Sequence, residues 1–273
     1  LRRGRTVGSV IQQFHSLERT MAHARAHIIE LERREESVGS GTVFLAQTLT
    51  GSRGRFNRYW HAPPGGLWGS MIYVNTLLPS SRLLVPLAVG VACCEAIREL
   101  GADSAKIRWI NDVMLSGKKV AGFLLEGFFG EFSKEEYTIA GFGINVNNTD
   151  FPEELKDIAT SLKQHLGLEV DLVRFTSTFI AKLCWNFGLL EFEEECFLKD
   201  QRFSGSGGGH ALLEQWLQFS DSVGRRVKFG FDILEGSGIE GVVSGISGDG
   251  GLILKLDDGS ELVEHSGEIR YCD

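Results

Sequence analysis

The segment 51–60 gathers the first side chains whose types suit chemistry. It contains Arg53, Arg55 and Arg58, together with Gly54 and Trp60. Guanidinium groups offer a planar fork of donors that matches phosphate and carboxylate oxygens, and glycine lets the backbone approach a ligand closely. The segment therefore fits an anion-binding loop. Taken alone, it is more simply interpreted as a solvated turn, because arginine side chains are mostly exposed in folded proteins.

A second group of polar residues flanks an expected hairpin. Asn111 and Asp112 follow a short strand, and Lys119 and Gly122 lie at the start of the next one. A carboxylate placed there can hold a metal–nucleotide, and a lysine can neutralise a reacting anion. A structural interpretation is equally open, in which Asn111 and Asp112 make the turn and Lys119 is a solvated edge charge.

Two further patterns are weaker. Residues 141–147 resemble a dinucleotide-binding loop, but they lack the G-x-G-x-x-G spacing and no helix clearly follows. His23 and His27 lie four positions apart on an expected helix, a spacing that can bind metal. No third ligand accompanies them, which favours an exposed helical pair. The sequence contains no nucleophile-elbow or P-loop pattern.

The N-terminal elements that must position these residues mix helices with strands. Apolar residues at helical spacing predict a helix from Leu17 to Arg34, with Ser16 as its N-cap. Residues 42–46 are β-branched and apolar, which is typical of a buried strand, and residues 67–77 predict another. The apolar segment 83–100 predicts a helix.

Further strands are predicted at 106–109, 120–125 and 137–146, with residues 113–118 turning between the first two. The order of helices and strands lacks strict βαβ alternation. This order favours an α+β fold.

The C-terminal part is predicted to form a small module. A helix over 171–196, a glycine- and serine-rich breaker at 204–209 and a short helix over 212–219 precede it. Residues 224–273 contain four or five short strands separated by glycine turns, which is typical of a small β-barrel. Two unequal domains are therefore expected.

Composition limits the classes of partner. The 273 residues carry a formal net charge of −8, which argues against a general affinity for nucleic acid, because such binding needs cations to neutralise phosphates. No apolar run approaches the roughly 18 to 20 residues that cross a bilayer, so a soluble, cytoplasmic protein is expected. The 5 cysteines form no C-x-x-C pair, which favours reduced thiols.

The motifs, in this order, resemble those of the biotin protein ligase family. Residues 52–60 are similar to its loop G-R-G-R-x-x-R-x-W, and residues 108–112 to its K-W-P-N-D. Residues 119–126 resemble K-x-A-G-I-L-x-E, and residues 141–147 resemble G-x-G-x-N-x-N. The likeness extends over nearly the whole chain, through residues 64–70, 159–162 and 267–269.

The resemblance implies a mixed-sheet catalytic domain of the biotin/lipoate ligase type over residues 1–209. A small SH3-like β-barrel is implied over residues 210–273. The family's reaction joins the biotin carboxylate to the α-phosphorus of Mg-ATP, giving biotinyl-adenylate. A lysine of a biotin carboxyl carrier protein domain then takes the biotin. ATP, Mg²⁺ and biotin are thus the implied cosubstrate, metal and substrate.

The resemblance also implies roles for individual residues. Lys119 matches the lysine that contacts the biotin carboxylate, and residues 53–55 match the loop that folds over the adenylate. Trp60 would pack near the nucleotide end. The implied catalytic residues are Lys119, Arg55 and Asp112, and Asp112 is also the implied metal ligand. The implied substrate-binding residues are Arg53, Gly54, Arg55, Arg58, Trp60, Asn111, Lys119, Gly122, Asn145 and Thr20.

The acyl end departs from the family pattern. Leu49 stands where the family usually places a biotin-contacting glutamine, and Gln47 takes that place only if the loop carries a two-residue insertion. Near the first helix, residues 18–20 are the nearest match to the usual S-T-N. The other replacements are Ser52 for glycine, Arg108 for lysine and Ile110 for proline.

Two alternatives stay open. Leu49 favours a ligase or transferase for lipoate or octanoate, whereas the C-terminal module and residues 108–112 and 119–122 favour biotin. A noncatalytic biotin-binding relative is disfavoured because the polar residues of the two motifs are retained, namely Arg53, Arg55, Asp112 and Lys119. Too few residues precede the catalytic region for a helix-turn-helix domain, so we expect a member without a DNA-binding domain. We also expect no membrane partner, and a homodimer stays open.

Overall fold

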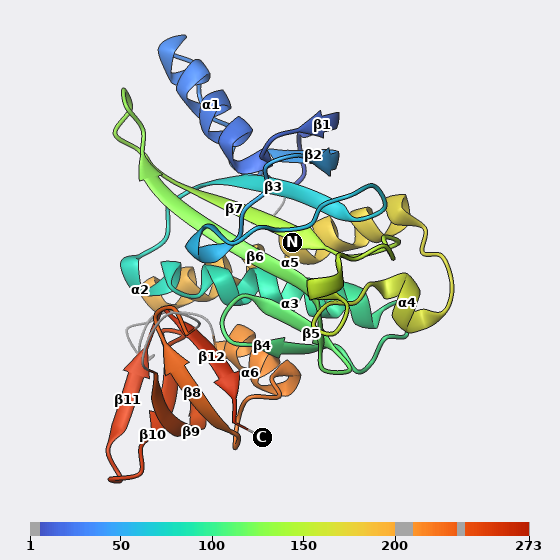
Figure 1. Ribbon diagram of the computed structural model, residues 1–273. Coiled ribbons are helices and arrows are strands. Elements are labelled where there is room, and N and C mark those ends of the chain that lie inside the picture. The colour runs from blue at the N-terminus through green and yellow to red at the C-terminus, as the bar shows by residue number, and fades with distance from the viewer. Residues whose placement is uncertain (1–5, 200–209, 234–237, 273) are drawn as a thin grey trace.

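A seven-stranded mixed sheet forms the centre of the computed structural model, which describes residues 6–199, 210–233 and 238–272 (Figure 1). Its strand order is β1-β2-β3-β7-β6-β5-β4. The first pair, β1 with β2, is parallel, and every later pair is antiparallel. The strands are β1 (Ile11–Leu17), β2 (Val43–Leu49), β3 (Leu67–Val74), β4 (Lys106–Arg108), β5 (Asp112–Leu115), β6 (Lys118–Phe129) and β7 (Glu136–Ile144).

Helix α1 (Thr20–Arg33) lies on one face of this sheet, at the top of Figure 1. Its buried stripe of Met21, Ala24 and Ile28 follows the spacing of one helical face. The stripe packs against Phe44 and Ile72 from β2 and β3. The apolar spacing along α1 thus determines which face of the helix packs against the sheet.

Helices α3 (Val85–Arg98) and α5 (Leu172–Lys199) cover the opposite face, and α6 (His210–Phe219) packs against both. Most residues of α3 are buried, as expected of a helix enclosed on several sides. The five cysteines, all within the described residues, form no disulfide. The shorter helices are α2 (Pro79–Arg82), α4 (Leu162–Leu166) and the 3₁₀ turns η2 (Arg55–Asn57) and η3 (Glu153–Leu155).

The stretch Pro79–Arg98, which joins α2 to α3, is long and apolar enough to cross a membrane by length and composition. The sequence expectation that no run approaches this length was wrong. Within the fold, 72% of the most apolar window is buried. The stretch therefore packs as the core helix of a globular domain.

The C-terminal strands form a five-stranded antiparallel sheet in the order β11-β10-β9-β8-β12, which fits the predicted SH3-like module. It packs against the main sheet, where the Trp109 ring lies 6.2 Å from the Phe229 ring between centroids. The proposed boundary at residue 209 and the breaker at 204–209 lie outside the described residues. The strands are β8 (Arg226–Gly230), β9 (Ile239–Ile246), β10 (Leu252–Lys255), β11 (Glu261–Glu264) and β12 (Glu268–Tyr271).

The α+β fold class is confirmed, and two local predictions were wrong. Ser16 is not an N-cap but lies in β1, because Leu17 pairs with Leu49 in the parallel ladder and the helix begins three residues later, at Thr20. The predicted turn over 113–118 is mostly strand β5, and only Ser116 and Gly117 turn, with φ of 49° and 81°. The other predicted elements are confirmed, with ends shifted by a few residues.

Candidate active site

A cavity of about 640 Å³ lies between the main sheet, the segment 51–60 and the C-terminal module. Residues from both the main sheet and the module line it, which brings together segments far apart in the sequence. All eleven residues implied by the sequence are among them, namely Thr20, Arg53, Gly54, Arg55, Arg58, Trp60, Asn111, Asp112, Lys119, Gly122 and Asn145.

Two neighbouring glycines make the floor on which Trp60 rests. Gly122 of β6 and Gly143 of β7 are paired in register. A Cβ added at Gly143 would lie 2.7 Å from the Trp60 ring, and one at Gly122 would lie 3.1 Å from it. Because only glycine leaves this space, the indole can lie against the sheet. The Lys119 Nζ is 5.2 Å from the same ring, within the range of a cation–π contact.

Asp112 binds two cations at the edge of the cavity. Its Oδ1 lies 2.6 Å from the Lys119 Nζ, and the Arg108 guanidinium donates to its Oδ2 at 2.6 Å. The Asp112 side chain is 13% exposed. Burial alone would raise the pKa of Asp112, but Lys119 and Arg108 outweigh it and hold the pKa below its usual value. The cluster therefore carries a net positive charge.

Backbone contacts on both sides fix this cluster. The Lys119 N–H donates to the Ile158 carbonyl at 2.8 Å, and the Thr160 N–H donates to the Lys119 carbonyl at 3.0 Å. The Asn111 amide donates to the Phe123 carbonyl at 2.8 Å, which ties the start of β5 to β6. The peptide bond between Trp109 and Ile110 is cis.

The arginine segment closes on itself as a short loop. The Ser52 hydroxyl donates to the Trp60 carbonyl at 2.6 Å, and the Gly54 N–H donates to the Arg58 carbonyl at 2.8 Å. Between these bonds Phe56 has a φ of 54°, a left-handed value that costs free energy in a non-glycine residue. Ser52, which replaces the first glycine of the family loop, thus joins the two ends of this loop.

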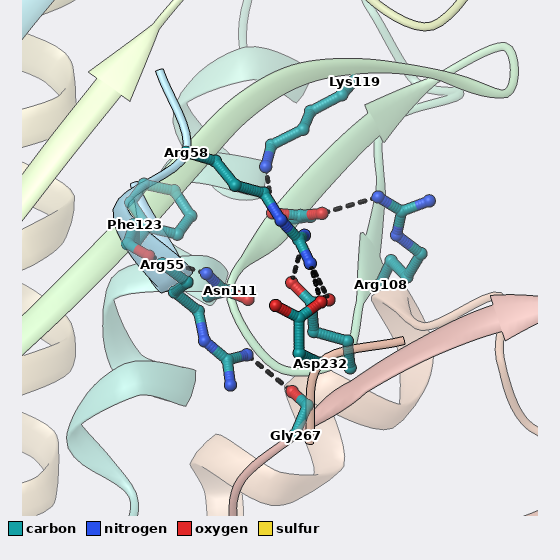
Figure 2. A network of polar contacts seen from close by, with 10 residues as sticks. Arg55, Arg58, Arg108, Asn111, Lys119, Phe123, Asp232 and Gly267 are labelled. Atoms are coloured by element: carbon teal, nitrogen blue, oxygen red, sulfur yellow. Dashed lines mark hydrogen bonds and ion pairs between the residues drawn. The ribbon is translucent and has the colours of Figure 1, made fainter. Parts of the chain in front are cut away.

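Figure 2 shows the arginines of the loop meeting the C-terminal module. The Arg58 guanidinium donates to both oxygens of Glu268, at 2.8 Å and 3.0 Å, and also pairs with Asp232. Arg55 donates to the Gly267 carbonyl at 2.5 Å. Burial lowers the pKa of Arg55, whereas the carboxylates around Arg58 outweigh burial and raise the pKa of that side chain. The module therefore holds two of the three loop arginines.

The remaining implied residues lie around the rim and the inner end. Arg53 is exposed, with its guanidinium carbon 6.0 Å from the Tyr59 ring centroid. Thr20 is buried at the first turn of α1, which no side chain caps. Asn145 is buried, and its side-chain oxygen accepts from Asn148 at 3.0 Å.

Several residues that line the cavity or hold its arginine loop were missed by sequence reasoning. Glu268 and Asp232 bind the loop, yet only a motif match at 267–269 pointed to that region. Arg19 also lines the cavity, although sequence reasoning assigned no role to it. Leu49 lines the cavity, whereas Gln47 is exposed, does not line it, and hydrogen-bonds to His15 at 3.0 Å.

The two weaker patterns do not form sites of their own. His23 and His27 are partly buried rather than exposed, and their rings contact the Phe44 ring at 5.1 Å and 5.2 Å between centroids. Burial, followed by the neighbouring His23, lowers the pKa of His27. Within the described ranges, no group of three or more His, Cys, Asp or Glu side chains could hold a metal ion. Residues 141–147 cover the end of β7 and the turn after it.

Comparisons with known proteins agree with this geometry. Residues 16–145 match the model of the biotin/lipoate A/B protein ligase family. The bifunctional ligase/repressor BirA of Bacillus subtilis is 31% identical over 231 residues, and the match covers 84% of this chain and 66% of that relative. The chain thus spans just under two thirds of the length of this relative.

A biotin–(acetyl-CoA-carboxylase) ligase of Paracoccus denitrificans is 26% identical over 239 residues, with 82% of this chain and 88% of that protein covered. The structure of a biotin protein ligase from Aquifex aeolicus in complex with biotin and ATP superposes with a TM-score of 0.74 at 26% identity. That superposition covers 96% of this chain and 99% of the other. Residues 16–145 thus form a domain of the biotin/lipoate A/B protein ligase family, and the similarity in sequence and in fold extends over most of the chain.

Proposed function

We propose that this protein is an ATP-dependent biotin protein ligase, which forms biotinyl-adenylate and transfers biotin to a lysine of a carrier domain. The observation that carries the proposal is the convergence of eleven implied residues on one cavity. The family membership and the Aquifex relative that binds biotin and ATP support it.

In the first step, a carboxylate oxygen of biotin attacks the α-phosphorus of ATP, and the bond to the pyrophosphate leaving group breaks. Two anions must meet, so their repulsion has to be reduced. Lys119 supplies a positive charge at this point, beside Arg108 and above the floor that Trp60 covers. A fixed cation in a half-buried site is worth more than one in water.

The arginine loop has a different task. Arg53, Arg55 and Arg58 provide donors for phosphate oxygens, and the loop as a lid excludes water from an intermediate that water would hydrolyse. In the structure, Arg58 pairs with two carboxylates of the C-terminal module. Phosphate must therefore compete with Glu268 and Asp232 for this side chain.

Asp112 is the residue we propose for Mg²⁺. Both of its oxygens pair with cations in the structure, so an ion would have to take the place of Lys119 or Arg108 at one of them, and the described residues contain no cluster of three potential ligands. Magnesium in nucleotide sites keeps several waters and binds one or two carboxylates plus substrate phosphates. The arrangement fits an ion that enters with ATP, where it would neutralise phosphate charge, rather than a resident ion.

In the second step, the amine of a carrier lysine attacks the acyl carbon of the adenylate, the bond to AMP breaks, and the nitrogen loses a proton. A biotin carboxyl carrier protein domain is the proposed acceptor. Asp112 lies beside Lys119 and carries a negative charge that can orient an incoming ammonium group.

Leu49 favours one competing substrate. It lines the cavity, and Gln47 does not replace it, so an apolar acid such as lipoate or octanoate is the second candidate. Incubation of the protein with Mg-ATP, a biotin carboxyl carrier domain and each acid in turn separates the two. We expect the mass of the carrier to increase with biotin. An increase in carrier mass with lipoate or octanoate, and none with biotin, would make that acid the substrate instead of biotin.

The Lys119→Ala variant tests the mechanism. Without the ammonium group, the carboxylate and the triphosphate repel each other unscreened, so we expect pyrophosphate release to fall at least about 100-fold, a loss comparable to that of other preorganised charge-stabilising groups. The circular dichroism spectrum should stay unchanged. Pyrophosphate release at the wild-type rate would remove Lys119 from the reaction.

A further inference from the structure

Arg19 is a cation of the cavity that the reaction described above does not use. It precedes α1 directly and lines the cavity. Within the part of the chain that the structure describes, its guanidinium has no hydrogen bond or ion pair, in contrast to Arg58 and Arg108. A partly buried guanidinium carries five donors, and leaving them unpaired away from water costs free energy. Arg19 is therefore available to an acceptor on a ligand.

The glycines of β7 place Arg19 relative to Lys119. A Cβ at Gly143 would meet Trp60, and a Cβ at Gly141, two residues earlier on the same face, would meet the Met21 sulfur at 2.4 Å. Two residues of a strand span roughly 7 Å. The start of α1 thus lies next to Trp60 along the floor, while Lys119 contacts Trp60 itself. An acid whose carboxylate meets Lys119 can extend along the floor toward α1.

At this end of the cavity Arg19 is accompanied by the Thr20 hydroxyl and by apolar side chains. Leu17 pairs with Leu49 across β1 and β2, and the Gly51 N–H donates to the Glu18 carbonyl at 3.1 Å. Arg19 therefore follows two residues after the partner of Leu49, and both side chains line the cavity. Leu49 and Met21 line the cavity there and offer no strong donor. The Glu18 side chain packs on Gly51, where an added Cβ would lie 2.8 Å from the Glu18 Cγ.

We propose that Arg19 is a specificity-determining residue that donates hydrogen bonds to the head group of the acyl substrate. The inference rests on the proposed function, because it names the substrate class of the same site. An acid that carries a strong hydrogen-bond acceptor at the end opposite its carboxylate, such as the carbonyl of a cyclic urea, can accept hydrogen bonds from the Arg19 guanidinium. Octanoate and lipoate have no such acceptor, so they gain nothing from Arg19.

The Arg19→Ala variant tests this assignment by calorimetric titration with biotin and with octanoate. Removing a hydrogen bond from a charged donor weakens binding by roughly 10- to 100-fold. We expect that increase in the Kd for biotin and less than a twofold change for octanoate. Adding Leu49→Gln to Arg19→Ala brings a neutral donor back to the same end, and we expect it to recover at least part of the biotin affinity.

Arg33→Ala is the matched control, since Arg33 lies in the last turn of the same helix, exposed and outside the cavity. It should leave both titrations unchanged. An unchanged Kd for biotin in Arg19→Ala, an equal loss for both acids, or no biotin binding by the wild type overturns the assignment. A measurement of pyrophosphate release separates the two proposals. If biotin binding depends on Arg19 but the protein releases no pyrophosphate, the role of Arg19 is supported and the ligase function is contradicted.

Discussion

Asp112 lies between Lys119 and Arg108, and its negative charge offsets the repulsion between these two cations. The two contacts of 2.6 Å leave both carboxylate oxygens engaged. Without that carboxylate, two positive charges would face each other in a partly buried place. An anionic ligand would offset the same repulsion. Because Asp112 neutralises only one of the two positive charges, the cluster can still attract an anion.

The Asp112→Asn variant should therefore lose stability as well as activity. Removing one partner of a partly buried ion pair leaves the others uncompensated, and we expect the free energy of unfolding to fall by about 1–3 kcal/mol at pH 7. The pKa of Asp112 is lowered in the folded state. Its contribution is thus complete above the unfolded value, about pH 4, and is lost as the pH falls further through the folded pKa.

Urea unfolding of the wild type and of Asp112→Asn between pH 8 and pH 3 measures this contribution. The difference in unfolding free energy should stay constant down to about pH 5 and shrink only below about pH 4. A difference that disappears between pH 7 and pH 5 would mean that burial outweighs the two cations and raises the pKa of this carboxyl.

At the scale of elements, β6 and β7 serve the site because each has a glycine, with no side chain, where Trp60 packs against the sheet. Gly122 and Gly143 make a flat floor because they are paired across the two strands and face the same side. Neither glycine has a left-handed φ, so the backbone accepts alanine at both positions. What alanine changes there is the space, and only for Trp60 and its neighbour Lys119.

Gly143→Ala should consequently damage the site more than the fold. The new Cβ would lie 2.7 Å from the indole, which forces Trp60 to move. We expect at least a tenfold loss in pyrophosphate release, with a melting temperature close to that of the wild type. Gly127→Ala is the control, because its Cβ would be 3.8 Å from the Tyr137 carbonyl oxygen, an ordinary contact. Equal activity in both variants would show that the position of Trp60 does not matter.

Elements with a local signature were predictable from the sequence, and those defined by distant partners were not. The apolar stripe of α1 and the alternation around β7 are local patterns. Strand β1 has no buried face and exists because it pairs with β2, more than thirty residues away in the chain. The start of α1 was misplaced for the same reason, since Ser16 resembles an N-cap only if the β1–β2 ladder is unknown.

The site follows the same rule. Ordered motifs were enough to select the residues that converge on the cavity, because each motif is contiguous. The ion pairs between Arg58 and the C-terminal module join residues 210 and 174 positions apart, which no local pattern reveals. Arg19 was overlooked for a different reason: a single arginine ahead of a helix carries no signal until the cavity beside it is known.

At the scale of the whole molecule, the C-terminal module acts on the loop rather than on the sheet floor. Glu268 and Asp232 bind Arg58, Gly267 accepts from Arg55, and the Phe56 ring packs against Phe231 at 5.1 Å between centroids. The loop has a left-handed φ at Phe56, so contacts outside the loop support its shape in addition to its two internal hydrogen bonds. Loop order in the absence of ligand therefore depends on the module.

The variant Glu268→Gln tests this dependence. It keeps the shape of the side chain and removes one of the two charges on Arg58, at a cost of roughly 1 kcal/mol for a half-exposed ion pair. If the loop detaches from the module and rebinds faster than trypsin cleaves, this cost raises the population of detached loop about fivefold. The rate of tryptic cleavage within the loop rises by the same factor. Mass spectrometry of the fragments would identify cleavage after Arg53, Arg55 or Arg58.

The control is Asp257→Asn in the same module, because Asp257 pairs with Arg226 at 2.7 Å on the surface and its side chain is 72% exposed. Its loss should not change cleavage in the loop. Saturating ATP should slow cleavage of the wild type and of Glu268→Gln to similar rates, since phosphate then takes the place of the missing carboxylate. Cleavage of Glu268→Gln at the wild-type rate without ATP would contradict the role of Glu268 in ordering the loop, and would leave Asp232 as the sufficient partner of Arg58 in the module.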